Sequence, residues 1–439
     1  MDESIRGQVV SAITCIALAG TLVYAGPMQA ADYDAQFTAG VGRSDNIGRT
    51  ATDKVEETFP IVGGTLDLTE KTRTVDADIS LRYSYVDYLD DTFDNENVAA
   101  IRADVTWSTS EGRFKWKLQE NFGRQLFDPF EPARPENWEN INYFSTGPEL
   151  RLFSAGRNSV DVSATYSNVK YEIRPYDNER VSGNVAFERE LSESRALSLN
   201  VTQEDISFSS NSPSPDFGRS EIFLALQSRS GRGDLDVEMG YTELDVDGLD
   251  KSDGFLFRLG VTRELSPFSR LEFSGGTQFS DQGNIFRYMQ DVTRDIDSIG
   301  DVTESGVPFR LNSVFASYVM DRARTNLYAS TGWEKEDYED RSDLNRTSLR
   351  FVVEINRELS RRFFAGLELG FYQREYDIIT RKDDDTVASA SFGIHVTPRV
   401  DVFARYSYRN RDSDTDVNSY TENLYFLNVA YTPRWAQSE

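Results

Sequence analysis

The chain has 439 residues and contains 47 Lys and Arg against 73 Asp and Glu, which gives a formal net charge of −26. This acidic balance argues against a nucleic-acid-binding protein, because phosphate contacts need clustered basic side chains. The mean hydropathy is −0.52, and after residue 30 no stretch supplies the roughly 18 continuous apolar residues that a membrane-spanning helix needs.

The N-terminal segment carries the only long apolar run. Residues 9–25 are apolar, Arg6 precedes them, and Ala30 follows. This order is typical of a secretory signal peptide, and we expect cleavage near Ala30, with an uncleaved anchor as the alternative. Cys15 is the single cysteine and lies inside the run. The mature chain would therefore have no disulfide and no cysteine metal site.

From residue 31 onward, apolar and polar residues alternate with a period of two. In residues 76–85, one face of an extended chain would carry Ala77, Ile79, Leu81, Tyr83 and Tyr85, and the other would be polar. Side chains of a strand point alternately to opposite sides, so each such segment has one apolar and one wet face. The alternation continues without a linker, and it predicts one all-β domain over residues 31–439, a closed antiparallel transmembrane barrel.

Two kinds of connection alternate between these segments. Short ones rich in Ser, Gly, Pro and Arg include residues 110–112, 154–158 and 397–399, and longer acidic ones lie between them. Outer-membrane barrels have short periplasmic turns and long extracellular loops. About nine short turns and about ten long loops predict about 20 strands, with 18 as the alternative. The strict alternation disfavours a soluble sandwich or propeller.

The acidic surplus gathers in segments that we expect to be loops: residues 87–97, 245–253, 334–343, 383–385 and 412–416. One interpretation is solvated loop charge. The other is that these loops share divalent cations with lipopolysaccharide phosphates. No loop has the spacing of a calcium-binding loop, so we predict no metal site.

Two connections are unusual. Residues 127–135 contain three prolines, which stiffen the segment. Residues 281–304 form the longest connection and carry Phe286, Met289, Val292 and Ile296 at helical spacing. A short amphipathic helix there would either fold into the lumen as a constriction or pack on the rim.

Catalytic chemistry has little support. His395 is the sole histidine, on a predicted strand with Ser391, and the spacing reveals no nucleophile partner. No glycine loop for phosphates and no zinc spacing occurs. We find no plug domain ahead of the barrel, which disfavours an energy-coupled metal-chelate transporter. We therefore expect no catalytic residue, no cofactor and no enzymatic activity.

If the apolar residues face lipid, the polar face lines the lumen. A charged side chain facing lipid at mid-membrane would cost roughly 2–4 kcal/mol, which fixes the sidedness. The predicted lumen residues are Asp76, Asp78, Arg82, Arg102, Asp104, Lys115, Lys117, Asp236, Glu238, Arg258, Glu272, Arg350, Glu354, Glu368, Arg374 and Arg405. They would form solvated cross-strand pairs, or a polar pathway for hydrophilic solutes.

Two short motifs suggest a family. Ser44-Asp45-Asn46-Ile47 and the segment 142–150, Asn-Tyr-Phe-Ser-Thr-Gly-Pro-Glu-Leu, resemble marks of a group of bacterial outer-membrane β-barrel proteins associated with exopolysaccharide or capsule production. The alternation of short turns and long loops is also similar to that of this group, over nearly all of the chain after residue 30. The resemblance implies polysaccharide export with periplasmic partners, and it implies no catalytic residue.

The sequence thus predicts a barrel in the outer membrane of a bacterium, in contact with outer-membrane lipids and lipopolysaccharide. The strand at residues 424–432 would serve the barrel-assembly machinery as its recognition strand. The leading hypothesis for function is a passive polar conduit that takes part in exopolysaccharide export. The alternatives are a general porin for small hydrophilic solutes and a structural or adhesive barrel with a closed lumen.

Overall fold

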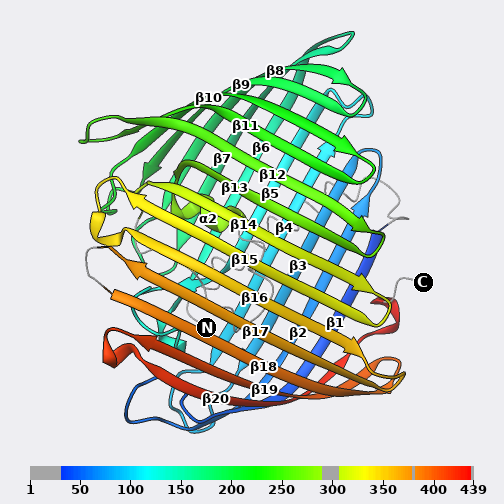
Figure 1. Cartoon of the computed structure of the whole chain (residues 1–439), viewed down its shortest axis with the longest axis vertical. Helices are drawn as coiled ribbons and strands as arrows, with labels where there is room; N and C mark the ends of the chain where they lie inside the picture. Colours follow the sequence, from blue (N-terminus) through cyan, green and yellow to red (C-terminus); the bar gives the residue numbers. More distant parts are fainter. Residues whose placement is uncertain (1–30, 289–305, 378–380, 437–439) are drawn as a thin grey trace.

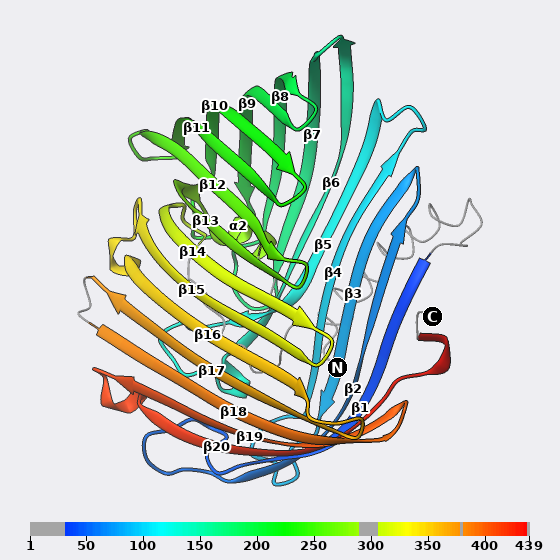
Figure 2. The ribbon, with the colours of Figure 1, turned by 45° about the vertical axis from the view of Figure 1, so that its right-hand side comes forward.

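The computed structural model describes residues 31–288, 306–377 and 381–436. Twenty β-strands in these ranges form one antiparallel sheet that closes on itself (Figures 1 and 2). Each strand pairs with its neighbours in sequence. The sheet closes where Phe37–Ser44 of the first strand pairs with Leu424–Tyr431 of the last. The predicted closed barrel of 20 strands is confirmed.

The strands are β1 (Ala31–Ser44), β2 (Glu57–Lys71), β3 (Val75–Val86), β4 (Glu96–Ser108), β5 (Phe114–Leu126), β6 (Trp138–Ala155), β7 (Asn158–Tyr171), β8 (Asn178–Ser192), β9 (Arg195–Phe208), β10 (Phe217–Ser230), β11 (Gly233–Val246), β12 (Ser252–Ser266), β13 (Ser269–Ser280), β14 (Phe309–Arg322), β15 (Thr325–Tyr338), β16 (Arg346–Glu358), β17 (Phe363–Tyr376), β18 (Arg381–Thr397), β19 (Val400–Ser413) and β20 (Tyr420–Tyr431). The helices are α2 (Gln282–Tyr288) and the 3₁₀ turns η1 (Pro135–Asn137), η3 (Ser342–Leu344), η4 (Asp416–Asn418) and η5 (Arg434–Ala436). Over the described ranges, no helix is long and apolar enough to cross a membrane.

The register decides which side chains face outward. Leu199 of β9 pairs with Leu224 of β10, and Val201 pairs with Ile222. These four apolar side chains are between 43% and 51% exposed. Apolar area left in water forgoes roughly 25 cal/mol per Å², so a continuous belt of such pairs suits hydrocarbon and not solvent.

The two rims of the barrel differ. Connections such as residues 193–194 and 231–232 are short, and they lie at the rim where β1 begins and β20 ends. The opposite rim carries the longer connections, among them residues 127–137 and 281–308. Near the short turns, Trp107 of β4 pairs with Trp116 of β5 on the outer face. Aromatic rings at this height are typical of the membrane interface. Because outer-membrane barrels have short periplasmic turns and longer extracellular loops, we place the short turns in the periplasm.

One predicted loop is wrong. Residues 383–385 were expected to be an acidic loop, but they lie inside β18 (Arg381–Thr397). Asp383 and Asp385 point inward and are 0% and 1% exposed. Arginines compensate their charge: Arg381 of the same strand pairs with Asp383 at 2.8 Å, and Arg411 of β19 donates two hydrogen bonds to Asp385, at 2.7 and 3.0 Å. A strand tolerates adjacent carboxylates when each inward one is paired.

The motif Ser44-Asp45-Asn46-Ile47 forms hydrogen bonds with β20 at the place where the first and last strands close the barrel. The backbone and side-chain nitrogens of Asn423, on β20, each donate to the Asp45 carboxylate at 2.7 Å. Asn46 donates to the carbonyl of Thr421 at 3.1 Å, and Ser44 donates to Glu422 at 2.7 Å. The motif therefore joins the first loop to the last strand, beyond the end of the β1–β20 ladder.

Candidate functional site: the lumen of the barrel

Helix α2 lies inside the barrel, against the wall formed by β5 to β8 (Figures 1 and 2). Phe286 is 1% exposed and packs among Ile141 and Tyr143 of β6 and Val169 and Tyr171 of β7. On the polar side of the helix, Arg287 donates to Gln119 at 2.8 Å, and its carbonyl accepts a hydrogen bond from Asn121 at 2.9 Å. Of the two placements that the sequence left open, the described helix has the one in the lumen.

A buried ion pair holds the start of this helix. Asp281 precedes α2, and both of its carboxylate oxygens accept hydrogen bonds from Arg180 of β8, at 2.5 and 3.1 Å. Asp281 also accepts a hydrogen bond from the backbone nitrogen of Asn284 at 3.2 Å. Burial alone would raise the pKa of Asp281, but the Arg180 guanidinium holds this pKa below its usual value. The carboxylate therefore stays ionised and keeps α2 docked.

The proline-rich connection, residues 127–137, crosses the outer mouth of the lumen. It leaves β5 and returns to β6, yet its Phe130 packs against Tyr376 of β17, with 5.0 Å between the centroids of the tilted rings. Phe130 also packs, together with Ile285 of α2, against an apolar cluster that includes Phe309 and Tyr338. The sheet order places β17 on the other side of the barrel from β5. The two inserted segments therefore meet over the same cluster, and they occupy the outer half of the lumen.

Three arginines of the far wall and of the first loop bind the backbone of this connection. Arg381 donates to the carbonyl of Phe130 at 2.6 Å, Arg411 to that of Glu131 at 3.3 Å, and Arg49 to that of Ala133. A guanidinium has five donors in a rigid fork, so it can pair with a carboxylate and still reach a carbonyl. The contacts hold the connection without using any hydrogen bond of the barrel ladder.

The ion pairs of this outer half are almost completely buried. Arg374 and Arg411 are each 1% exposed and share Asp385. Arg346 donates to both oxygens of Glu336 at 2.9 and 3.1 Å, and both side chains are 4% exposed. Because buried charges are costly unless paired, the networks fix the positions of the inserted segments as well as of the wall.

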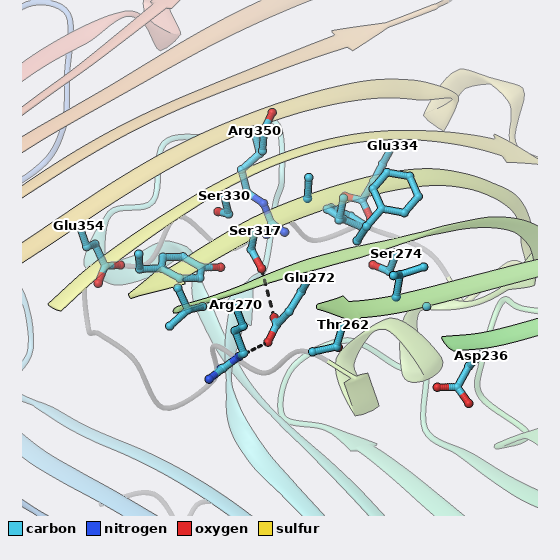
Figure 3. Close-up of a pocket in the computed structure, with 18 of the residues that line it drawn as sticks. Asp236, Thr262, Arg270, Glu272, Ser274, Ser317, Ser330, Glu334, Arg350 and Glu354 are labelled. Atoms are coloured by element: carbon cyan, nitrogen blue, oxygen red, sulfur yellow. Dashed lines mark hydrogen bonds and ion pairs between the residues drawn. The ribbon is translucent and has the colours of Figure 1, made fainter. Parts of the chain in front are cut away.

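The periplasmic half is open. A cavity of about 1180 Å³ runs along β11 to β16, from residues near the short turns up to Asn284 and Ile285 (Figure 3). Its wall carries both signs of charge and many hydroxyl groups. Arg270 pairs with Glu272 at 2.5 Å, and Ser317 donates to the same carboxylate at 3.1 Å. The cavity thus offers hydrogen-bonding groups to a polar solute, among apolar side chains such as Phe315 and Leu327.

The register places all the predicted lumen residues on the face opposite the apolar belt. They lie on β3 to β5 (Asp76, Asp78, Arg82, Arg102, Asp104, Lys115, Lys117), on β11 to β13 (Asp236, Glu238, Arg258, Glu272), and on β16, β17 and β19 (Arg350, Glu354, Glu368, Arg374, Arg405). Asp236, Glu272, Arg350 and Glu354 line the open cavity. That these residues form a pathway for solutes stays a prediction.

Several of these residues are brought together as pairs. Arg258 binds Glu238 at 2.9 Å and Glu221 at 2.9 and 3.0 Å. Lys115 and Lys117 share Glu149 at 3.0 and 2.6 Å. Further pairs are Arg102 with Asp104, at 3.2 Å, and Arg405 with Glu368, at 2.7 Å. In contrast, Asp76 and Asp78 are exposed to the lumen.

Of the predicted constriction residues, Phe286 lies in α2, whereas Met289, Val292 and Ile296 fall outside the described residues, as do residues 1–30. The cleaved signal peptide and the extent of the constriction therefore stay predictions.

His395 sits between two carboxylates near the periplasmic rim. Its Nδ1 lies 2.7 Å from Asp401 and its Nε2 lies 3.1 Å from Glu358. Both ring nitrogens are thus engaged by acidic groups, and neither faces a serine hydroxyl. A general base needs a free nitrogen toward its nucleophile, so the geometry favours a structural role.

Sequence reasoning missed the residues that build the outer half. Arg180, Asp281 and Arg411 were not among the predicted lumen residues, although Arg411 follows Arg405 at even spacing and the alternation could have been continued to it. The positions of Ile141 and Tyr143 could not be predicted from the alternation. Both are apolar residues on the lumen face, where polar residues are expected, and they are there because Phe286 of α2 packs against them.

These features define a porin-like β-barrel of the bacterial outer membrane: a closed sheet, an apolar outer belt and a charged interior. The family model described as "Putative beta-barrel porin 2" matches residues 326–432, which cover β15 to β20. Among curated proteins, none matches the chain.

The comparison with solved structures found several similar proteins. The FrpB iron transporter from Neisseria meningitidis (F3-3 variant) has 8% identity over 91% of this chain and 81% of that chain, with a TM-score of 0.42. A mutant ferric enterobactin receptor, PfeA, from Pseudomonas aeruginosa has 7% identity over 92% and 81%, with a TM-score of 0.45. The outer membrane protein opdK from Pseudomonas aeruginosa has 11% identity over 92% and 98%, with a TM-score of 0.37.

Proposed function

We propose that this barrel is a closed polar conduit of the outer membrane, opened by movement of residues 127–137 and α2, and that its cargo is an exported polysaccharide. The observation that carries the proposal is the division of the lumen into a packed outer half and an open periplasmic half. The packed half is made by segments outside the barrel ladder. Such segments can leave the lumen without breaking a strand pairing.

The interior chemistry supports a hydrophilic polymer as cargo. The cavity of about 1180 Å³ exceeds the ~300–1,000 Å³ of typical small-molecule sites, so it has room for several sugar rings. Paired carboxylates and guanidiniums, with Ser and Thr hydroxyls between them, present acceptors and donors for sugar hydroxyl groups. The family resemblance of residues 44–47 and 142–150 favours the same cargo.

A planar-bilayer experiment tests the conduit. We expect the wild-type protein to conduct little, and a variant with residues 129–135 replaced by a Gly-Ser linker of equal length to conduct steadily. The matched control replaces residues 247–250, which connect β11 and β12 and make none of these contacts. Large steady conductance of the wild type would favour the general porin, and silence of every variant would favour a structural or adhesive barrel.

Deletion of the gene tests the cargo separately. We expect a loss of surface polysaccharide that the wild-type gene restores and that the linker variant does not worsen. Unchanged surface polysaccharide would remove the export proposal and leave the conduit standing. We also expect no enzymatic activity, and turnover of a polysaccharide by the purified protein would contradict this.

A further inference from the structure

Of the two arginines that line the open cavity, Arg270 pairs with a carboxylate and Arg350 is held differently. Phe315 of β14, Gly332 of β15 and Arg350 of β16 are cross-strand partners in a single row on the lumen face. The same row continues through Tyr372 of β17 to Asp385 of β18. Figure 3 shows the Arg350 side chain extending toward the cavity beside Ser330.

Gly332 makes the geometry possible. A Cβ at this position would lie 2.3 Å from Cδ1 and 2.4 Å from Cε1 of Phe315, so the ring occupies the space where a side chain would stand. The guanidinium carbon of Arg350 lies 5.1 Å from the centroid of that ring. The three residues form a stack in which glycine admits the ring and the ring supports the guanidinium.

No carboxylate in the described part of the chain pairs with Arg350. The nearest candidate in its row, Asp385, is shared by Arg374 and Arg411. In the cavity, Glu272 is engaged by Arg270, and Asp236 accepts two hydrogen bonds from Arg229 at 2.8 and 2.9 Å. Glu272 and Asp236 are thus already paired with other arginines, while the Arg350 side chain lines the open cavity.

We propose that Arg350 binds the carboxylate of an acidic sugar, so that the cargo of the conduit is a polysaccharide containing uronic acid units. The inference rests on the proposed function. A guanidinium matches a carboxylate in two parallel hydrogen bonds, and a stacked guanidinium keeps the required plane. Around it, Ser317, Ser330 and Tyr328 present hydroxyl groups to the same cavity. These groups suit the hydroxyls of a sugar ring and add selectivity over a bare carboxylate.

Isothermal titration of the detergent-solubilised full chain tests the site with glucuronate, glucose and acetate. We expect glucuronate to bind, Arg350→Gln to weaken its binding at least tenfold, and Arg350→Lys to weaken it less, because lysine keeps the charge and loses the fork. The matched control is Arg357→Gln, which removes the same charge from the same strand on its outer face. Heat-dependent mobility on gels verifies that each variant is a folded barrel.

Equal glucuronate affinity of wild type and Arg350→Gln would overturn the site. Glucose binding as tightly as glucuronate would overturn the requirement for a carboxylate, and acetate binding as tightly would overturn the requirement for a sugar. The titration needs no conductance, so the two proposals fail separately. If the linker variant conducts and glucuronate does not bind, the acidic-sugar site is wrong and the conduit stands.

Discussion

The outer and periplasmic halves of the lumen are built on the same strands but hold charge in opposite ways. In the outer half, Arg374, Arg411 and Asp385 are at most 1% exposed and bind one another. In the periplasmic half, Asp34 and Asp78 are exposed, and Arg270 and Glu272 pair while their side chains remain 47% and 41% exposed. The same strands run through both halves. The difference comes from residues 127–137 and α2, which cover the outer half and exclude water from it.

This comparison separates two tasks of charged lumen residues. A buried pair in a covered lumen contributes to the energetics of closure, because removal of one partner leaves an uncompensated charge. An exposed pair in an open lumen is screened by water and salt, and contributes little to stability. The same substitution should therefore have a large effect in one half and a small effect in the other.

The largest effect is expected at Asp385. Asp385→Asn keeps the side-chain shape and leaves Arg374 and Arg411 without their carboxylate, so the free energy of unfolding should fall by about 3–5 kcal/mol. Denaturant unfolding of the barrel in lipid vesicles measures the change. Asp78→Asn is the control in the open half and should shift stability by less than about 0.5 kcal/mol. Similar losses in the two variants would show that the two halves do not differ in this way.

An intermediate effect is expected when acid protonates Asp281. The pKa of Asp281 in the folded protein lies below its ordinary value of 3.8. A lowered carboxyl pKa means that its stabilisation is fully present above 3.8 and is lost as the pH falls through the folded value. Conductance should therefore stay low from pH 7 to about pH 4 and rise below that range as α2 leaves the wall.

The control for this pH effect is Asp281→Asn, which removes the titrating group. The variant should conduct more than wild type at pH 7, because Arg180 loses its carboxylate, and its conductance should change less with acid. A wild-type conductance that rises in acid equally in the variant would assign the transition to another carboxyl group.

Strand number, closure and sidedness of the fold could be predicted because they depend on local geometry. The period of two fixes a face wherever one side meets lipid, and the short turns mark each hairpin, so Ile79 and Arg82 are assigned to opposite faces from the sequence alone. The lumen pairs Arg258–Glu238 and Arg405–Glu368 follow from the same rule once the register is known.

The inward folding of residues 127–137 and α2 could not be predicted, because it depends on contacts across the barrel. Phe130 meets Tyr376 and Arg381, which are more than two hundred residues away in sequence. A local sequence pattern cannot predict contacts between residues so far apart in the chain. The apolar residues on the wet face, such as Tyr143, contradict the alternation until their partner Phe286 is in place. Departures from a regular pattern of this kind mark the points where a barrel wall receives an inserted segment.

The smallest effect is expected on the ion preference of the periplasmic half. Asp34 of β1 faces Asp67 of β2, and Asp78 of β3 faces Asp104 of β4, all on the lumen side. Of these four, only Asp104 has an arginine partner in the described residues. The wall of β1 to β4, which is separate from the Arg350 cavity on β11 to β16, therefore carries excess negative charge that attracts cations. Replacement of Asp34, Asp67 and Asp78 by Asn in the linker variant should lower its cation-to-anion permeability ratio by about twofold at low salt, with the difference shrinking near 1 M as the Debye length falls to about 3 Å. Reversal potentials under a salt gradient measure the ratio.

The control for this prediction replaces three carboxylates on the outer rim, Asp245, Asp247 and Asp250, which removes equal charge outside the lumen. These substitutions should leave the permeability ratio unchanged. An equal drop of the ratio in both variants would assign the selectivity to the net charge of the protein and not to this wall.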